Sequence, residues 1–123
     1  MKQVSLSAVL VAVLMGASAA RAQDPVKVDP KHYSVMVEND AIRVLRIHYA
    51  PGEKSVMHSH PDAVIVFLAD QKAKMTHPDG KSEEVSGKKG DAAFSPAGAH
   101  LPENIGSGPI EVILVELKKP ATK

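Results

Sequence analysis

Three histidines are the residues of this chain whose types and spacing are best suited to chemistry. His58 and His60 are one residue apart and precede a long apolar run, and His100 follows a turn rich in glycine and proline. Alternate side chains of an extended strand point to the same face, so His58 and His60 are expected to project together. They could hold one metal ion if a third ligand came from elsewhere in the fold. The alternative is that both face water as ordinary polar side chains.

The other three histidines give weaker signals. His77 precedes the turn at Pro78 and is expected at the surface. His48 shares a strand face with Arg46 and is expected to face water or the rim of a pocket. His32 falls in an N-terminal arm and carries no motif.

The first 22 residues read as a secretory signal peptide. An apolar run from Val4 to Ala20 follows Lys2, and Ala20-Arg21-Ala22 fits the small-x-small cleavage pattern. The run is short for a spanning helix, which needs about 20 apolar residues, although an uncleaved anchor stays an alternative. We therefore expect cleavage after Ala22, a periplasmic or secreted protein, and membrane contact only through the uncleaved segment.

Charge and cysteine content exclude several classes of function. Cleavage would remove two basic residues, Lys2 and Arg21, and no acidic one, so the formal net charge of +1 would become −1. Nucleic acid is not expected as a partner, because no strong basic patch is present. The chain has no cysteine, which excludes a disulfide scaffold and a thiol nucleophile.

The elements that must position the histidines are short strands. Turn signals recur every eight to twelve residues from Tyr33 onward, which predicts an all-β sandwich or barrel. No segment has helical periodicity over a useful length. The expected strands are Ser34–Glu38, Ile42–Tyr49, Val64–Leu68, Lys72–Thr76, Ser82–Ser86, Ala92–Ser95 and Ile110–Leu117, with a further strand ending at the His58–His60 pair.

The 123 residues suit one domain. We divide them into a signal peptide (1–22), an extended N-terminal arm with a first strand (23–40), a barrel (41–118) and a tail (119–123). Residues 64–68 and 110–115 are apolar on both faces, which is typical of strands covered on both sides. We expect a second sheet on one face and a subunit contact, as in a homodimer, on the other.

Two segments, Gly52–His60 and Gly90–Asn104, resemble the two motifs of the cupin superfamily. Those motifs are G-x5-H-x-H-x3/4-E-x6-G and G-x5-P-x-G-x2-H-x3-N, and the resemblance extends over about residues 42–117. It implies a double-stranded β-helix, the jelly-roll barrel of cupins, with one divalent metal (Fe, Mn, Ni, Zn or Cu) inside. It also implies that His58, His60 and His100 are metal ligands and that Asn104 supports a turn.

The sequence departs from these motifs twice. The glutamate is missing, since its expected positions hold Val64 or Ile65. The second motif is one residue short between Gly98 and His100. If the turn absorbs the deletion, His100 joins the other two; if not, it rotates to the opposite face. Three neutral imidazoles without a carboxylate would leave the ion its full +2 charge and make it a stronger Lewis acid.

Two acidic residues are candidates for supporting roles. Asp62 has the parity of His58 and His60, so it could hydrogen-bond to a metal ligand or itself replace the missing one, unless it only forms a bend. Glu103 is a second candidate for the same supporting or substitute-ligand role, and an outside candidate for an acid/base role. The expected pocket residues, which could equally be plain core, are Tyr49, Met57, Val64, Met75, Phe94 and Asn104.

Three functions fit these observations. The first is a small metalloenzyme, such as an Fe(II)-type dioxygenase or related enzyme acting on a small organic acid. The second is a non-catalytic cupin that binds or senses a metal or small ligand, and the third is a metal-free isomerase-like cupin. Whether the protein is an enzyme stays open. A free histidine titrates near pH 6.5, so a bound metal should be lost on mild acidification.

Overall fold

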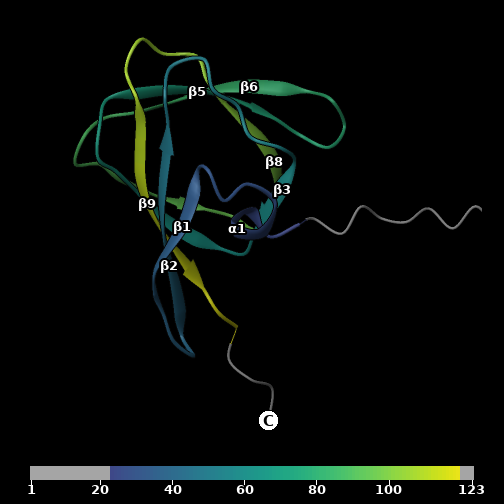
Figure 1. Ribbon diagram of the computed structural model, residues 1–123, viewed down its shortest axis with the longest axis vertical. Helices are drawn as coiled ribbons and strands as arrows, with labels where there is room; N and C mark the ends of the chain where they lie inside the picture. The colour runs from purple at the N-terminus through teal and green to yellow at the C-terminus, as the bar shows by residue number, and fades with distance from the viewer. Residues whose placement is uncertain (1–22, 120–123) are drawn as a thin grey trace, which may run out of the picture.

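The computed structural model describes residues 23–119, which fold into two antiparallel sheets and one helical turn (Figure 1). The prediction of an all-β protein of short strands is confirmed. The elements are α1 (Pro25–Val28), β1 (Tyr33–Glu38), β2 (Ile42–Tyr49), β3 (His58–His60), β4 (Ala63–Phe67), β5 (Gln71–Thr76), β6 (Ser82–Gly87), β7 (Ala92–Ser95), β8 (Gly98–Asn104) and β9 (Ile110–Leu117).

The two long strands, β2 and β9, belong to one sheet, and the two strands that carry the histidines, β3 and β8, belong to the other. The first has the order β1-β2-β9-β4-β7 and the second the order β3-β8-β5-β6. Inward side chains of β2 and β9 form most of the buried core, with Leu45, Tyr49 and Leu114 almost fully covered. The larger sheet therefore supplies the apolar wall behind the shorter histidine-bearing strands.

β8 was not among the expected strands, and Pro102, which stands inside it, made the regularity of this segment uncertain. Proline lacks an N–H and is unfavourable in most strand interiors. Here the Pro102 carbonyl still accepts a hydrogen bond from the Ser55 N–H at 2.9 Å. β8 thus keeps its alternation through Pro102 and carries His100 in regular register.

The prediction of an extended arm before Tyr33 is wrong. Residues 25–28 form a helical turn, α1, whose N-cap Asp24 accepts a hydrogen bond from the Val26 N–H at 3.0 Å. Proline at the first helical position and aspartate just before it are typical helix-start signals. α1 lies beside β3 (Figure 1), so the arm reaches the strand that carries His58 and His60.

β4 and β9, the strands predicted to be covered on both faces, lie inside the larger sheet. Their inward side chains face the core, whereas Val64 and Val115 pair on the outward face. A row of apolar side chains continues from them across the sheet to its two edges. In strand order its members are Val37, Val44, Val115, Val64 and Phe94.

Some predictions fall on residues outside the described range. They are the signal peptide at residues 1–22, its cleavage after Ala22, and most of the tail at 119–123. Within residues 23–119, no helix is long and apolar enough to cross a membrane.

Candidate metal centre

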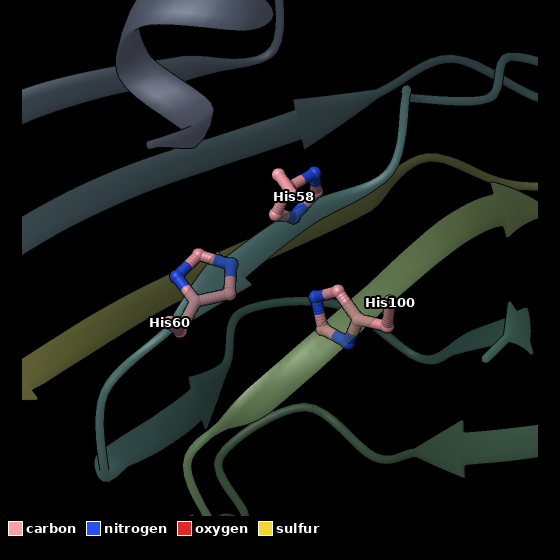
Figure 2. Close-up of side chains that lie close together, drawn as sticks. All are labelled: His58, His60 and His100. Carbon is pink, nitrogen blue, oxygen red and sulfur yellow. The ribbon is translucent and has the colours of Figure 1, made fainter. Parts of the chain in front are cut away.

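Neighbouring antiparallel strands bring the three predicted histidines together. β3 pairs with β8 so that His58 lies opposite His100 and His60 lies opposite Gly98. One ring nitrogen from each histidine lies within 4.8 Å of those of the other two. Figure 2 shows the three rings gathered over the two strands. His58 is 0% exposed and His60 8% exposed, so the cluster is inside the protein.

His100 points toward the other two histidines, which resolves the alternative left open by the shortened motif. β8 already begins at Gly98, and its pairing with β3 puts His100 opposite His58, so the shortened spacing leaves His100 on the face of the other two histidines. The Nε2 atom of His100 is buried and has no hydrogen-bond partner. An unpartnered buried nitrogen is unusual in a folded protein and suits a metal ligand.

His58 presents its Nε2 lone pair to the cluster. Its Nδ1 lies 2.8 Å from the Val56 carbonyl oxygen, which can only accept, so Nδ1 carries the proton. On the other side of the ring, Nε2 lies 3.0 Å from the hydroxyl of Tyr33. Tyr33 begins β1 and was missed by the sequence analysis, because no motif connects it with the histidines.

His60 is held by a buried carboxylate that the sequence analysis also missed. Its Nδ1 lies 2.7 Å from Glu116 Oε2, and Arg43 Nε donates to Glu116 Oε1 at 2.6 Å. Burial opposes ionisation of Glu116, but the hydrogen bonds from His60 and Arg43 lower its pKa below the ordinary value. A carboxylate on the second nitrogen fixes the tautomer and orientation of a ligating imidazole.

The N-terminal arm supports both β3 histidines from behind. Arg43 donates to both carboxylate oxygens of Asp24, at 2.8 and 3.0 Å, which continues the Glu116 contact to the start of α1. At the end of α1, Asp29 accepts from Ser55 Oγ at 2.5 Å, and the same Oγ lies 3.3 Å from His58 Nδ1. Two polar connections therefore lead from the arm to the candidate ligands.

The cluster favours neutral imidazoles. Burial, followed by the charge of His60, lowers the pKa of His58 to about 4. Burial, followed by the charges of His60 and His58, lowers the pKa of His100 to about 3. Both rings are therefore unprotonated at neutral pH, which is the form that binds metal.

A cavity of about 550 Å³ adjoins the histidines. Its walls are mostly apolar, with Ile47, Ile65 and Leu114 among them, and Gln71 and Ser95 add polar side chains to the lining. Tyr33, Tyr49, His60 and His100 form one group, here called the inner end of the cavity, in which neighbouring ring centroids lie 6.0, 5.8 and 5.3 Å apart. His77 and Glu83, 3.1 Å apart, form a pair whose side chains are partly exposed.

The structure places the predicted pocket residues unevenly. Tyr49 and Met75 line the cavity. Phe94 borders it but is 62% exposed and pairs with the outward-facing Val64. Val64 and Met57 do not line it, because they have the opposite strand parity to the inward residues Ala63 and His58.

Asn104 also lies outside the cavity lining and supports a turn, as the resemblance implied. Its amide nitrogen donates to the carbonyl oxygens of Tyr49 and Gly108, at 3.1 and 2.9 Å. Its Oδ1 accepts from the Gly106 N–H at 3.0 Å. The side chain thereby closes residues 105–108 against the end of β2.

Neither acidic candidate from the sequence joins the histidine group. Asp62 is exposed and accepts a hydrogen bond from the Ala97 N–H at 2.8 Å, which makes it part of a bend. Glu103 faces away from His100 because β8 is regular there. Ile65, one of the two positions expected to hold the family glutamate, is apolar and lines the cavity.

The residues present fit a divalent metal ion. Three imidazoles converge. In His58 and His60 the hydrogen bond at Nδ1 leaves Nε2 unprotonated, and in His100 the buried Nε2 has no hydrogen-bond partner. Neutral imidazole is a ligand common to Fe, Ni, Cu and Zn. The centre is a candidate site of the three-ligand type, in which further positions stay open to a small molecule.

Comparison with known proteins identifies the fold. No protein-family model matches the sequence, and no curated protein matches it. A cupin domain from Bordetella pertussis Tohama I is 22% identical, with a TM-score of 0.66 over 71% of this chain and 92% of that one. A Klebsiella pneumoniae protein with a double-stranded β-helix domain is 25% identical, with a TM-score of 0.57 over 73% and 78% of the two chains.

A third solved structure agrees with these two. An RmlC-like cupin family protein from Methanocaldococcus jannaschii is 19% identical, with a TM-score of 0.54 over 73% of this chain and 84% of that one. All three have the fold that the two histidine motifs implied. The chain therefore has the double-stranded β-helix fold of the cupin superfamily.

Proposed function

We propose that this protein binds one divalent metal ion through His58, His60 and His100 and acts, as a metalloenzyme of the Fe(II) dioxygenase type, on a small organic acid. The observation that carries the proposal is the convergence of the three ring nitrogens beside a cavity of about 550 Å³. An ion held by neutral imidazoles keeps its full charge and supplies a Lewis acid with open coordination positions.

The chain's own residues support this role in distinct ways. Glu116 and Val56 each accept from an Nδ1–H and so direct the Nε2 atoms of His60 and His58 toward the centre. The apolar walls limit the access of water to the inner end of the cavity. Fe, Mn, Ni, Zn and Cu are all candidate metals, since imidazole ligands serve each of them.

Metal titration of the chelator-treated protein tests the binding half of this proposal. We expect one Fe(II), Co(II) or Zn(II) ion per chain, and a loss of at least a hundredfold in affinity in His58→Ala and in His100→Ala. His48→Ala is the matched control, because His48 contacts Glu111 on the exposed side of β2. Binding that survives in the two variants, or fails in the unchanged protein, contradicts the site.

Oxygen consumption tests the catalytic half. The Fe(II)-loaded protein is incubated with a panel of small carboxylic acids, and we expect consumption that depends on one class of acid. His58→Ala should abolish it. Undiminished turnover in that variant would remove the dioxygenase proposal.

A non-catalytic ligand-binding cupin is the second candidate. Among the described residues that line the cavity, Glu83 is the one with a carboxylate, and it is paired with the partly exposed His77. The lining therefore offers no free carboxylate as a catalytic acid or base, which favours binding without catalysis. Such a protein would show ligand-induced thermal shifts without turnover. A metal-free isomerase-like cupin would instead keep full activity after chelation.

We also propose that the outward row of the larger sheet is the contact of a homodimer. The row crosses five strands and is apolar throughout, with Val37 and Phe94 more than half exposed at its ends. Contiguous apolar patches on a protein surface commonly mark interfaces. Val115→Lys should convert a dimer to a monomer by sedimentation analysis, whereas a monomeric unchanged protein refutes the dimer.

Residues 1–22 remain a proposed signal peptide, and the protein a proposed periplasmic or secreted one. N-terminal sequencing of protein from the native compartment tests both. A mature chain that begins at Gln23 supports cleavage after Ala22, whereas a retained Met1 in a cytoplasmic fraction contradicts it.

A further inference from the structure

A buried pair of tyrosines meets the candidate metal centre at the inner end of the cavity. The Tyr33 hydroxyl lies 2.5 Å from the Tyr49 hydroxyl and 3.0 Å from His58 Nε2. Both side chains line the cavity and are almost fully buried. They are the two tyrosines of the chain, and no motif accounts for their position.

The direction of each hydrogen bond in this group follows from its partners. Because His58 Nδ1 donates to the Val56 carbonyl, Nε2 of the neutral ring can only accept. Tyr33 therefore donates to His58. The Tyr33 oxygen then accepts from the Tyr49 hydroxyl, so that the donors run from Tyr49 through Tyr33 to His58.

Metal binding and this hydrogen bond exclude each other. Coordination by His58 uses the same Nε2 lone pair to which Tyr33 donates. Once that pair is taken, the Tyr33 O–H must turn to another acceptor, since a buried donor left without one is costly. Tyr49 is the donor to Tyr33 and does not need to change.

The cavity offers few acceptors for the released hydroxyl group. Its inner end contains His60 and His100, which the metal would occupy, and its walls are apolar side chains such as Ile65, Phe67 and Val112. The Glu83 carboxylate is paired with His77. Hydroxyl oxygens such as that of Tyr49, 2.5 Å away, are neutral acceptors, and Tyr49 would have to stop donating to Tyr33 in order to accept. A carboxylate oxygen of a bound small molecule is charged and accepts a stronger hydrogen bond, and it leaves the Tyr49 donor in place.

The same lining limits the chemical class of that molecule. No lysine or arginine stands among the described residues that line the cavity, so an anionic group has its favourable partners only at the inner end. The apolar walls suit a ligand with an apolar body, and the Glu83 carboxylate disfavours a second negative charge on the ligand near the His77–Glu83 pair.

We propose that Tyr33 donates a hydrogen bond to a carboxylate oxygen of the ligand and thereby selects a monocarboxylate with an apolar body. This inference rests on the metal site proposed for the same cavity. Tyr33 has two positions in it, on His58 when no metal is bound and on the carboxylate when metal and ligand are bound. Removing its hydroxyl should therefore weaken the binding of the ligand without weakening the binding of the metal.

Cobalt-loaded full-length protein provides the test, because its visible spectrum reports both metal binding and ligand binding. Benzoate is the probe, and benzamide is its neutral counterpart of the same shape. The unchanged protein should bind benzoate at least about tenfold more tightly than benzamide. In Tyr33→Phe, Co(II) affinity should stay equal or rise up to about tenfold, while benzoate affinity falls about ten- to a hundredfold.

Tyr49→Phe is the matched control, since it removes the same group from the same pair. Its hydroxyl reaches His58 only through Tyr33, so we expect benzoate affinity to fall by no more than about fivefold. An unchanged benzoate affinity in Tyr33→Phe would overturn the role of Tyr33. Equal weakening of Co(II) and benzoate in that variant would also overturn it, because that result indicates a structural role.

Two further outcomes separate this inference from the metal site. Co(II) binding by the unchanged protein without any preference for benzoate over benzamide overturns the inference and leaves the metal site standing, even if Tyr33→Phe does not fold. Failure of the unchanged protein to bind Co(II) overturns both.

Discussion

The two strands that carry the histidines are supported in different ways. On β3, His58 and His60 each donate from Nδ1 to a fixed oxygen, and a polar network extends from them to the N-terminal arm. On β8, His100 has an Nε2 with no partner and is set by strand register and burial. Side-chain hydrogen bonds therefore orient the histidines on β3, whereas strand register, burial and ring contacts orient the histidine on β8.

The largest expected effect comes from removing the carboxylate behind β3. Glu116→Ala leaves Arg43 and the Nδ1–H of His60 without their buried partner, and breaking a buried ion pair costs about 3–5 kcal/mol. Metal affinity should fall about ten- to a hundredfold, as is typical when the partner of a ligating histidine is lost. Urea unfolding and metal titration measure the two effects.

Glu111→Ala is the control for that variant on the same strand. Glu111 pairs with Arg46 and His48 on the exposed face, where an ion pair contributes about 1 kcal/mol or less. Equal losses of metal affinity in the two variants would contradict the special role of the Glu116 side.

Acid should destabilise the metal-free protein, because one histidine on each of the two strands, His58 on β3 and His100 on β8, resists protonation in the folded state. The pKa values of His58 and His100 are lowered in the folded state to about 4 and about 3, so below pH 6.5 the unfolded chain takes up protons first. Stability is then present above about pH 6.5 and falls as the pH decreases toward those values, by at most about 1.4 kcal/mol per pH unit for each histidine. Urea unfolding from pH 7.5 to 4 measures this slope.

His100→Phe sharpens the pH comparison, because it removes one of the two titrating groups. The slope of the unfolding free energy against pH should decrease by up to about 1.4 kcal/mol per pH unit, which corresponds to one proton. An unchanged slope would contradict the neutral, buried state of His100. The lowered pKa values also revise an expectation from the sequence. Proton competition at these two rings should begin at lower pH than a free histidine near pH 6.5 implies.

A smaller effect is expected where the polar network reaches the arm. Asp24→Asn keeps the N-cap oxygen but removes the charge that faces Arg43. The pair is partly exposed, so we expect a loss of about 1 kcal/mol and a change in metal affinity below about threefold. A loss as large as that of Glu116→Ala would mean that the arm, rather than Glu116, orients His60.

The smallest effect is expected at Asp62, the acidic residue that the sequence placed near the metal. Asp62→Asn retains an oxygen for the Ala97 N–H, so the metal affinity should remain within about twofold of the unchanged value and the stability within about 0.5 kcal/mol. A clear drop in metal affinity would return Asp62 to the site.

Most of the fold and the three histidines could be predicted because their signals are local. Turn residues mark the strand ends, and the period of two places His58 and His60 on one face. Tyr33, Arg43 and Glu116 could not be predicted, because their distance from the histidines depends on the order of β1, β2 and β9 in the sheet. One signal was available: Glu116 continues the inward row Ile110, Val112 and Leu114, where a charged residue needs a buried partner.

Anomalous scattering from crystals of the metal-loaded protein, recorded at the absorption edge of the bound metal, tests the central claim most directly. The account predicts one peak per chain, at coordination distance of about 2.0–2.2 Å from a ring nitrogen of each of His58, His60 and His100. A peak elsewhere, or an ion that one of these three rings does not touch, would contradict it.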